Sequence, residues 1–191
     1  QAGREHEDFT TPAEQPKRIF VAGGGPAGLE AARLAAVRGH EVTLFESRDK
    51  LGGQVNLASV APYKQETSQV IRYLAREVEK VGVNVELGKK LTPELVKKLK
   101  PDTVIVATGA KPIRPNSIPG IDGENVVSSW EVLGGTSKAA LSGNIVIIGG
   151  GLVGCEVADF LADTEDNTGA VPTKVTMLEM QPRMAIEGID E

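Results

Sequence analysis

The stretch from Lys17 to Ala32, KRIFVAGGGPAGLEAA, constrains the fold more than any other part of this chain. Its apolar run, 19–22, is typical of a short buried strand, and an alanine-rich segment with helix-forming composition comes after it. Between the two, Gly23, Gly25 and Gly28 fall at the GxGxxG spacing. A strand, a glycine turn and a helix in that order predict a dinucleotide-binding βαβ unit.

Each glycine of this turn has its own physical role. Gly23 permits the tight turn, Gly25 lets the backbone approach a pyrophosphate, and Gly28 lets helix and strand pack closely. The N–H groups at the start of the helix would then face the phosphates. The next predicted strand, 42–45, ends in Glu46, which can accept hydrogen bonds from a ribose 2′-hydroxyl. The alternative is a glycine turn that only packs a helix.

The same pattern occurs again towards the carboxyl end. A predicted strand, 144–148, is followed by GGGLVG with glycines at the same spacing, by a helix beginning around 155–161, and by a strand, 174–178, ending in Glu179. The longer interval from glycine to acid lies in the polar segment 163–173, which we expect to be a surface excursion. Two such folds are most simply explained by one flavin and one nicotinamide nucleotide.

Between the two patterns the chain alternates predicted helices and strands. A helix over 66–81 is expected to face a sheet through its apolar positions, Val70, Ile71, Leu74, Val78 and Val81. A strand at 83–87, a helix at 92–99 capped by Thr92, and a strand at 103–107 follow. The proline-containing segment 111–125 suits a crossover between domains, and a short helix is predicted at 128–133.

Composition narrows the class of protein. A net charge of -5 over 191 residues gives no basic footprint for nucleic acid, and no apolar run approaches membrane-spanning length. Residues 1–15 lack the apolar core of a secretory signal. The single cysteine excludes an internal disulfide and favours a cytoplasmic protein. A chain that begins with Gln rather than Met is expected to be a processed or excised piece.

The sequence predicts redox chemistry without an acid–base dyad. A flavin and a nicotinamide together carry out hydride transfer, for which the protein supplies geometry. We therefore predict no catalytic side chain and no metal ligands, and we expect His6 and His40 to be surface residues. Cys155 is expected to face the sheet rather than to act as a redox thiol. Glu179 favours NADH over NADPH, although Arg183 lies close to it in sequence.

Several motifs together resemble a known module. GGGPAGLEAA, GHEVTLFE, LGGQ, VATGA, IPGI and GGGLVGCE are similar to the two-dinucleotide-domain flavoproteins, and the leader Ala2–Glu5 resembles the segment after the iron–sulfur cysteines of one branch. That branch is the NADH:flavin oxidoreductases related to 2,4-dienoyl-CoA reductase, 2-enoate reductase and trimethylamine dehydrogenase. The resemblance implies an α/β fold of Rossmann-like FAD/NAD(P)-binding domains with parallel sheets, truncated at the carboxyl end. It implies an FAD domain at 17–125 and a crossover with an incomplete NAD(P) domain at 126–191. Residues 1–16 contain two prolines, several acids and few large apolar residues, and are expected to be a linker or arm.

The resemblance also implies which residues bind each cofactor. FAD would be held through its pyrophosphate, its ribose and its flavin nucleotide by Gly23, Gly25, Pro26, Ala27, Gly28, Glu46, Gly53, Gln54, Ala107, Thr108 and Gly109. NADH would be held by Gly149, Gly151, Leu152, Val153, Gly154 and Glu179. The paired glycines Gly52 and Gly53 are either an ordinary turn or a second close approach of backbone to cofactor.

The implied function is an NADH-dependent flavoprotein oxidoreductase. Electrons would pass from NADH through FAD and a [4Fe-4S] cluster to FMN in a barrel domain that reduces an enoate or acyl-CoA double bond. The cluster cysteines, the barrel and the returning carboxyl-terminal segment are not in this sequence, and 51–56 lacks the cysteine pair of disulfide reductases. Two alternatives stay open, a structural ADP-binding domain and an input domain of a glutamate-synthase-like complex. The isolated fragment is expected to be inactive and to dimerise.

Overall fold

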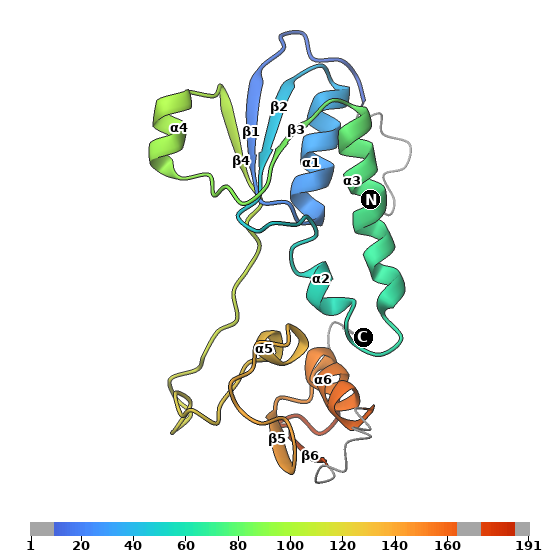
Figure 1. Cartoon of the computed structure of the whole chain (residues 1–191), viewed down its shortest axis with the longest axis vertical. Helices are drawn as coiled ribbons and strands as arrows, with labels where there is room; N and C mark the ends of the chain where they lie inside the picture. Colours follow the sequence, from blue (N-terminus) through green and yellow to red (C-terminus); the bar gives the residue numbers. More distant parts are fainter. Residues whose placement is uncertain (1–9, 164–172, 186–191) are drawn as a thin grey trace. The chain divides into compact units, whose positions relative to one another are not determined.

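A computed structural model describes residues 10–163 and 173–185, which form two compact units. The first unit contains 10–56 and 67–110 of the described residues, and the second contains 57–66 and the described residues from 111 onwards. Each unit has its own parallel sheet (Figure 1).

The sheet of the first unit has four parallel strands in the order β3-β2-β1-β4. Its strands are β1 (Arg18–Ala22), β2 (Glu41–Phe45), β3 (Asn84–Glu86) and β4 (Thr103–Val106). The predicted strands agree with these within a residue at their ends. In the register of the central pair, Val21 lies opposite Leu44 of β2 and Ile105 of β4. The carboxyl ends of β1, β2 and β4 therefore meet at one edge of the sheet.

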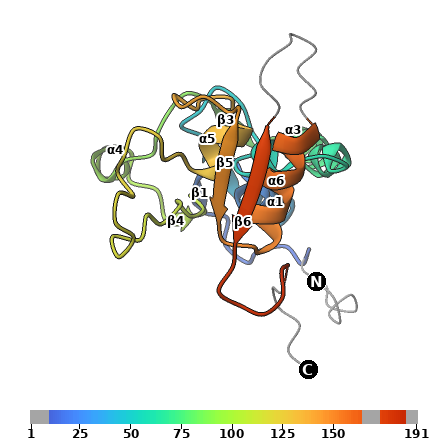
Figure 2. The ribbon, with the colours of Figure 1, turned by 90° about the horizontal axis from the view of Figure 1, so that it is seen from below.

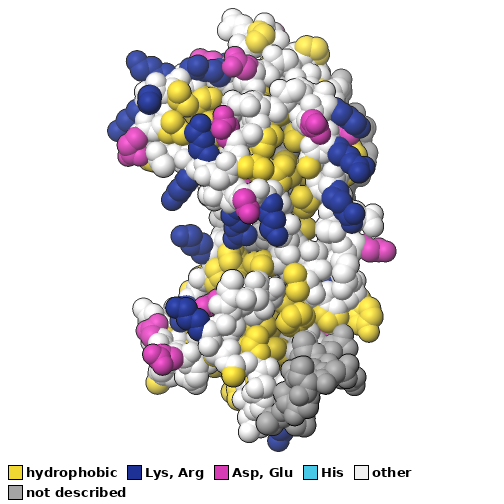
Figure 3. All heavy atoms as spheres, viewed as in Figure 1, with side chains coloured by type: hydrophobic (Ala, Val, Ile, Leu, Met, Phe, Trp, Pro, Cys, Tyr) yellow, Lys and Arg dark blue, Asp and Glu magenta, His cyan; other side chains and the backbone are white. Residues whose placement is uncertain are grey.

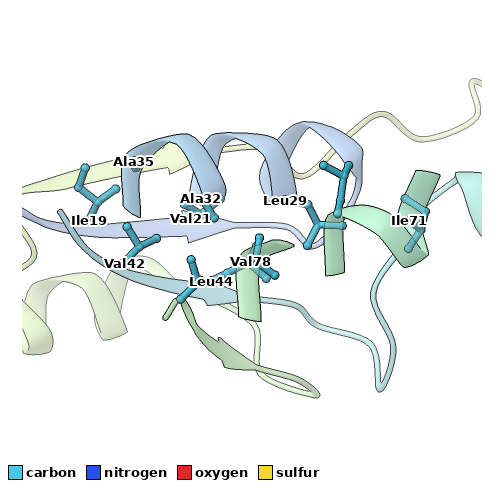
Figure 4. Close-up of a cluster of buried hydrophobic side chains, with 11 residues drawn as sticks. Ile19, Val21, Leu29, Ala32, Ala35, Val42, Leu44, Ile71 and Val78 are labelled. Carbon is cyan, nitrogen blue, oxygen red and sulfur yellow. The ribbon is translucent and has the colours of Figure 1, made fainter. Parts of the chain in front are cut away.

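Two long helices complete the core of this unit. Helix α1 (Pro26–Val37) connects β1 to β2, and α3 (Ser68–Lys80) packs beside it (Figure 1). Figure 4 shows the buried cluster that the sheet and these helices share. It contains Ile19, Val21, Leu29, Ala32, Ala35, Val42, Leu44, Ile71, Leu74, Val78 and Val83. Alanines at the inner face of α1 bring this helix close to the strands.

The prediction that the apolar face of α3 packs on a sheet was wrong in its main partner and at one position. Ile71, Leu74 and Val78 are buried, and Val81 packs against the same cluster, but Val70 is 52% exposed. Helix α3 packs chiefly against α1 rather than directly on the sheet. Contact with a single neighbouring helix buries a narrower stripe than contact with a sheet, and Val70 lies outside that stripe.

Three short helices also belong to the described chain: α2 (Val55–Ala58), η1 (Gln65–Thr67) and α4 (Pro93–Leu99). Helix α4 begins as predicted, because the Thr92 side chain accepts a hydrogen bond from the Leu95 N–H at 3.3 Å. Its end lies against β1, where the Arg18 guanidinium donates to the carbonyls of Leu99 and Lys100. Arg18 thereby joins the end of α4 to the start of β1.

The second unit has a two-stranded parallel sheet covered on one face by a helix (Figure 2). Its elements are α5 (Ser129–Leu133), β5 (Asn144–Ile148), α6 (Leu152–Asp163) and β6 (Lys174–Leu178). Helix α5 has a complete capping box, in which Ser128 and Glu131 each bond the other's backbone N–H. Val132 and Leu133 of α5 pack with Val157 and Leu161 of α6. Most of the expected excursion at 163–173 lies outside the described residues.

The other face of this sheet is exposed within the described structure. Burial alternates along β5 and β6, and Val146, Ile148 and Leu178 are 58%, 62% and 53% exposed. Such a face normally packs against another layer. Hydrophobic side chains also reach the surface seen in Figure 3, among interspersed basic and acidic ones. None of the described helices is long and apolar enough to cross a membrane.

Candidate dinucleotide-binding sites

The glycine turn after β1 is built on backbone contacts that no larger residue permits. Gly23 has a φ of +112°, and a Cβ there would lie 2.3 Å from the Ala107 carbonyl oxygen. A Cβ on Gly28 would lie 1.8 Å from the Gly23 carbonyl oxygen. The turn and the first turn of α1 are therefore packed directly on each other and on the end of β4.

Gly25 differs from these two glycines because space is open beside it. The nearest atom to a Cβ at this position is the Gly53 Cα at 3.9 Å. Its φ of -78° and ψ of -178° suit any residue, so the backbone conformation does not require glycine. The open space beside the turn is what an approaching phosphate needs. Pro26, at the first helical position, has no N–H to leave unpaired.

A second glycine segment packs on the first. The Gly52 N–H donates to the Gly24 carbonyl at 2.8 Å, and a Cβ on Gly53 would lie 3.1 Å from the Gly25 Cα. Gly52 and Gly53 have φ values of +120° and +55°. Two strips of bare backbone thus run together at the carboxyl edge of the sheet. This pairing favours the close-approach interpretation of Gly53 over that of an ordinary surface turn.

The remaining predicted residues of the first site lie at the same edge. Ala107 extends the pairing of β4 with β1, since its N–H donates to the Ala22 carbonyl at 2.8 Å. The Gln54 amide nitrogen donates to the Ala110 carbonyl at 3.1 Å, which ties the second glycine segment to 107–110. Gly109 has a φ of +70°. Residues separated by more than 80 positions in sequence thus come together through parallel strand pairing.

The acid at the end of β2 has bonds that sequence reasoning missed. Glu46 is only 6% exposed, and its Oε2 accepts a hydrogen bond from the Gly24 N–H at 2.7 Å. Its Oε1 accepts from the Arg48 N–H at 2.9 Å and from the Ser47 hydroxyl at 3.2 Å. The acid therefore contacts the glycine turn directly. The sequence does show an acid at the end of the second strand. Its distance along the chain from the glycine turn, however, does not predict that its side chain contacts that turn.

The second unit repeats this turn. Gly149 has a φ of +105°, and a Cβ on Gly154 would lie 2.0 Å from the Gly149 carbonyl oxygen. Gly151 lies just before α6, as Gly25 lies before α1. Leu152 and Val153, in the first turn of α6, are about half exposed. One difference is that nothing described lies within 4 Å of a Cβ on Gly149, whereas the end of β4 crowds Gly23.

The acid of the second unit makes the same two backbone hydrogen bonds as Glu46. Glu179 Oε2 accepts from the Gly150 N–H at 2.6 Å, and its Oε1 accepts from the Gln181 N–H at 2.7 Å. These backbone donors, with that of Gln181 contributing most, lower the pKa of Glu179 below its ordinary value of 4.5. The carboxylate is thus held in its charged form beside the second glycine turn.

The chemistry of both turns suits an anionic nucleotide. In each, the first N–H groups of a twelve-residue helix have no carbonyl partner within the helix and lie at the positive end of its dipole. In α1 these donors belong to Ala27 and Gly28. The described residues hold no group of three or more His, Cys, Asp or Glu side chains that could bind a metal. Each turn thus places backbone N–H donors beside a carboxylate, groups that are chemically suited to a phosphate and to ribose hydroxyls.

Two side chains outside the predicted sites have defined surroundings. The Cys155 thiol donates to the Gly150 carbonyl at 3.5 Å and is half-buried. His40, also half-buried, accepts a hydrogen bond from the Lys17 N–H through Nδ1 at 3.1 Å. Each of these two side chains therefore has a hydrogen bond with a backbone group.

Comparison with known proteins gives consistent matches. Residues 17–191 match the family model "Pyridine nucleotide-disulphide oxidoreductase". The chain is 43% identical over 188 residues to bilirubin reductase of Mediterraneibacter gnavus, covering 97% of this chain and 27% of that protein. It is 43% identical over 173 residues to NADH oxidase of Thermoanaerobacter brockii, covering 90% and 25%. The chain thus spans about a quarter of the length of these relatives.

A solved structure agrees with the sequence matches. The 2-naphthoyl-CoA reductase complex superposes with a TM-score of 0.81 at 36% identity, covering 92% of this chain and 25% of that one. The disulfide chemistry in the family's description has no counterpart within the 191 residues, which contain one cysteine. The expected α/β fold with Rossmann-like parallel sheets is confirmed. The chain belongs to the pyridine nucleotide-disulphide oxidoreductase family of FAD/NAD(P)-binding flavoprotein oxidoreductases.

Proposed function

We propose that this chain is the electron-input module of an NADH-dependent flavoprotein reductase, with FAD in the first unit and NADH in the second. The observation that carries the proposal is the repeated site. In each unit a glycine turn, a helix start and a strand-end carboxylate lie together, and the carboxylate bonds the middle glycine of the turn. Two nucleotide sites in one oxidoreductase chain suit the transfer of electrons between two nucleotides.

In the first unit the residues present fit the diphosphate and ribose of FAD. The open space at Gly25 and the unpaired N–H groups of Ala27 and Gly28 would face the pyrophosphate. Glu46 would accept from the adenosine ribose. Gly53 and Gln54, with 107–109, would lie along the flavin nucleotide. When bound, the flavin accepts a hydride equivalent from reduced nicotinamide and passes the electrons on.

In the second unit the residues that would hold NADH are Gly149, Gly151, Leu152, Val153, Gly154 and Glu179. An ionised carboxylate at the ribose position repels a 2′-phosphate, so NADH is the proposed donor rather than NADPH. We assign the FAD domain to 17–125 and the crossover with the NAD(P) domain to 126–191.

In the whole protein we propose that electrons leave this module through a [4Fe-4S] cluster to FMN in an N-terminal barrel domain. The length of the relatives supports an additional domain, since this chain covers about a quarter of them. Reduction of an activated carbon–carbon double bond is the proposed reaction, in the cytoplasm. The chain by itself is proposed to be inactive and to dimerise through the exposed face of β5 and β6, which light scattering over a range of concentrations would test.

Anaerobic addition of NADH to the whole protein tests the main proposal. We expect the visible absorbance of bound flavin to fall as NADH is added. A Gly25→Val variant should lose FAD, because its side chain fills the space meant for phosphate. An absorbance unchanged by NADH, in protein shown to contain FAD, would contradict the electron-input role.

The ligand released on denaturation separates the main proposal from the structural alternative. Release of FAD supports the electron-input role, whereas ADP without flavin would mean that the first unit only holds a nucleotide. If the chain is instead an input domain of a glutamate-synthase-like complex, the NADH-reduced flavin should pass its electrons to an acceptor other than an activated carbon–carbon double bond.

A further inference from the structure

The two nucleotide sites share a pair of hydrogen bonds that ribose binding does not explain. Glu46 and Glu179 each accept one bond from the second glycine of the preceding turn, at 2.7 and 2.6 Å. Each also accepts one from the N–H two residues further along, at 2.9 and 2.7 Å. The same pair of hydrogen bonds to one carboxylate therefore occurs in two units that share no residues.

We propose that Glu46 and Glu179 are positioning residues that fix the two glycine turns before any nucleotide binds. The inference rests on the proposed function and adds a second role to the ribose contact. Each carboxylate links the end of one strand to the turn that follows its neighbour. The turn is then held in its binding shape by the strand that carries the ribose acceptor.

The physical reason lies in the freedom of the turn. Three successive glycines, 23–25 in the first unit and 149–151 in the second, have more backbone conformations to lose than any other residue type. A hydrogen bond from a backbone N–H to a carboxylate is stronger than one between neutral groups, so it can hold such a segment. It also directs the middle N–H away from the ligand, leaving the donors at the start of the helix for phosphate.

The burial of Glu46 supports this role. The residue is only 6% exposed, and it accepts three hydrogen bonds from its own chain. A carboxylate serving only a ligand would not need a backbone partner on each oxygen. In the second unit Glu179 is more exposed and still makes both backbone bonds, so burial is not what creates the arrangement.

Hydrogen exchange in the nucleotide-stripped whole protein tests the proposal without any ligand. In Glu46→Gln and Glu179→Gln, an NH₂ group replaces one acceptor oxygen. The side chain can then accept from only one of the two backbone N–H groups, and only through a neutral oxygen, which forms a weaker hydrogen bond than a carboxylate does. We expect peptides covering 22–26 and 148–152, respectively, to exchange at least tenfold faster. Glu41→Gln, on the exposed end of β2, and Asp159→Asn, on the exposed face of α6, are the matched controls and should exchange as wild type. Wild-type exchange in both turn variants would overturn the proposal.

A chemical comparison separates positioning from ribose contact. The probe is an FAD analogue whose adenosine ribose lacks the 2′- and 3′-hydroxyls. If Glu46 fixes the turn, Glu46→Gln should lower the affinity of the protein for FAD and for this analogue by a similar factor of at least tenfold. A loss confined to FAD itself would show that the acid acts only through the ribose.

The positioning role can still be tested if a variant does not fold or if the proposed FAD binding is not observed. If Glu46→Gln does not fold, the more exposed Glu179→Gln still decides the exchange test in the second unit. A wild-type protein that binds no FAD would contradict the proposed function but would leave the exchange result in both turns as the test of positioning.

Discussion

Replacing Gly28 with alanine is the sharpest test of how the first site is built. The added methyl carbon would lie 1.8 Å from the Gly23 carbonyl oxygen, 3.0 Å from its carbonyl carbon and 3.4 Å from the Ala107 Cβ. The closest of these atoms is backbone, so no side chain can rotate aside. Helix α1 would have to move away from the turn by roughly 1.5 Å to restore an ordinary contact.

The cost follows from two opposing effects. Forcing a methyl group into a packed site lowers the free energy of unfolding by about 1–3 kcal/mol. Because the neighbouring atom here is backbone and cannot rotate aside, we expect the upper end of this range, about 3 kcal/mol. Alanine is favoured over glycine inside a helix by about 1 kcal/mol, which offsets part of that. We therefore expect a net destabilisation of about 2 kcal/mol, or roughly a 30-fold rise in the open population of this unit.

Native-state hydrogen exchange of β1 and β2 measures this change within the first unit. Gly25→Ala is the matched control, because its methyl group would have the Gly53 Cα as nearest neighbour at 3.9 Å. The control should keep wild-type exchange without nucleotide and should lose FAD affinity. A Gly28→Ala variant as stable as wild type, or a Gly25→Ala control equally destabilised, would refute the packing argument.

Three further predictions concern single side chains. Thr92→Ala removes the N-cap of α4 and should destabilise that helix by about 1 kcal/mol, seen as faster exchange of α4 amides; unchanged exchange would contradict the capping role. Tyr63 is 92% exposed and has a φ of +61°, a conformation that glycine adopts at less steric cost. Tyr63→Gly should therefore leave the thermal midpoint of the chain unchanged or raise it, and a clear fall in the midpoint would contradict this reasoning. The pKa of Glu179 is lowered in the folded chain, so its stabilisation is complete above the ordinary value of 4.5 and is lost as pH falls through the lowered pKa. Protection of the Gly150 amide, corrected for its intrinsic exchange rate, should fall over that acidic range, and protection independent of pH there would count against the bond.

Much of the fold could be predicted from local patterns. Both strands of the second unit begin and end at the predicted residues, 144–148 and 174–178. Thr92 and Ser128 are cap residues because their short side chains reach backbone donors three residues ahead, a purely local geometry. The glycine spacing and the strand-end acids were likewise visible in the sequence.

Contacts between distant segments could not be predicted in the same way. Val70 has the same periodicity as Ile71 and Leu74, yet it is exposed because α3 packs chiefly on a helix. The pairing of Gly52 with Gly24 depends on where the loop after β2 returns. Neither feature has a spacing rule that a reader of the sequence could apply.

The sequence by itself determined the type and order of the elements and the two turns that suit a diphosphate, because these depend on neighbours a few residues apart. Only the tertiary structure decided that Glu46 and Glu179 hold the turns, that Gly28 has no room for a methyl group, and that Gly25 has open space beside it. Parallel pairing brings the ends of distant strands to one edge of a sheet, and the distances across that edge are set by packing rather than by spacing along the chain.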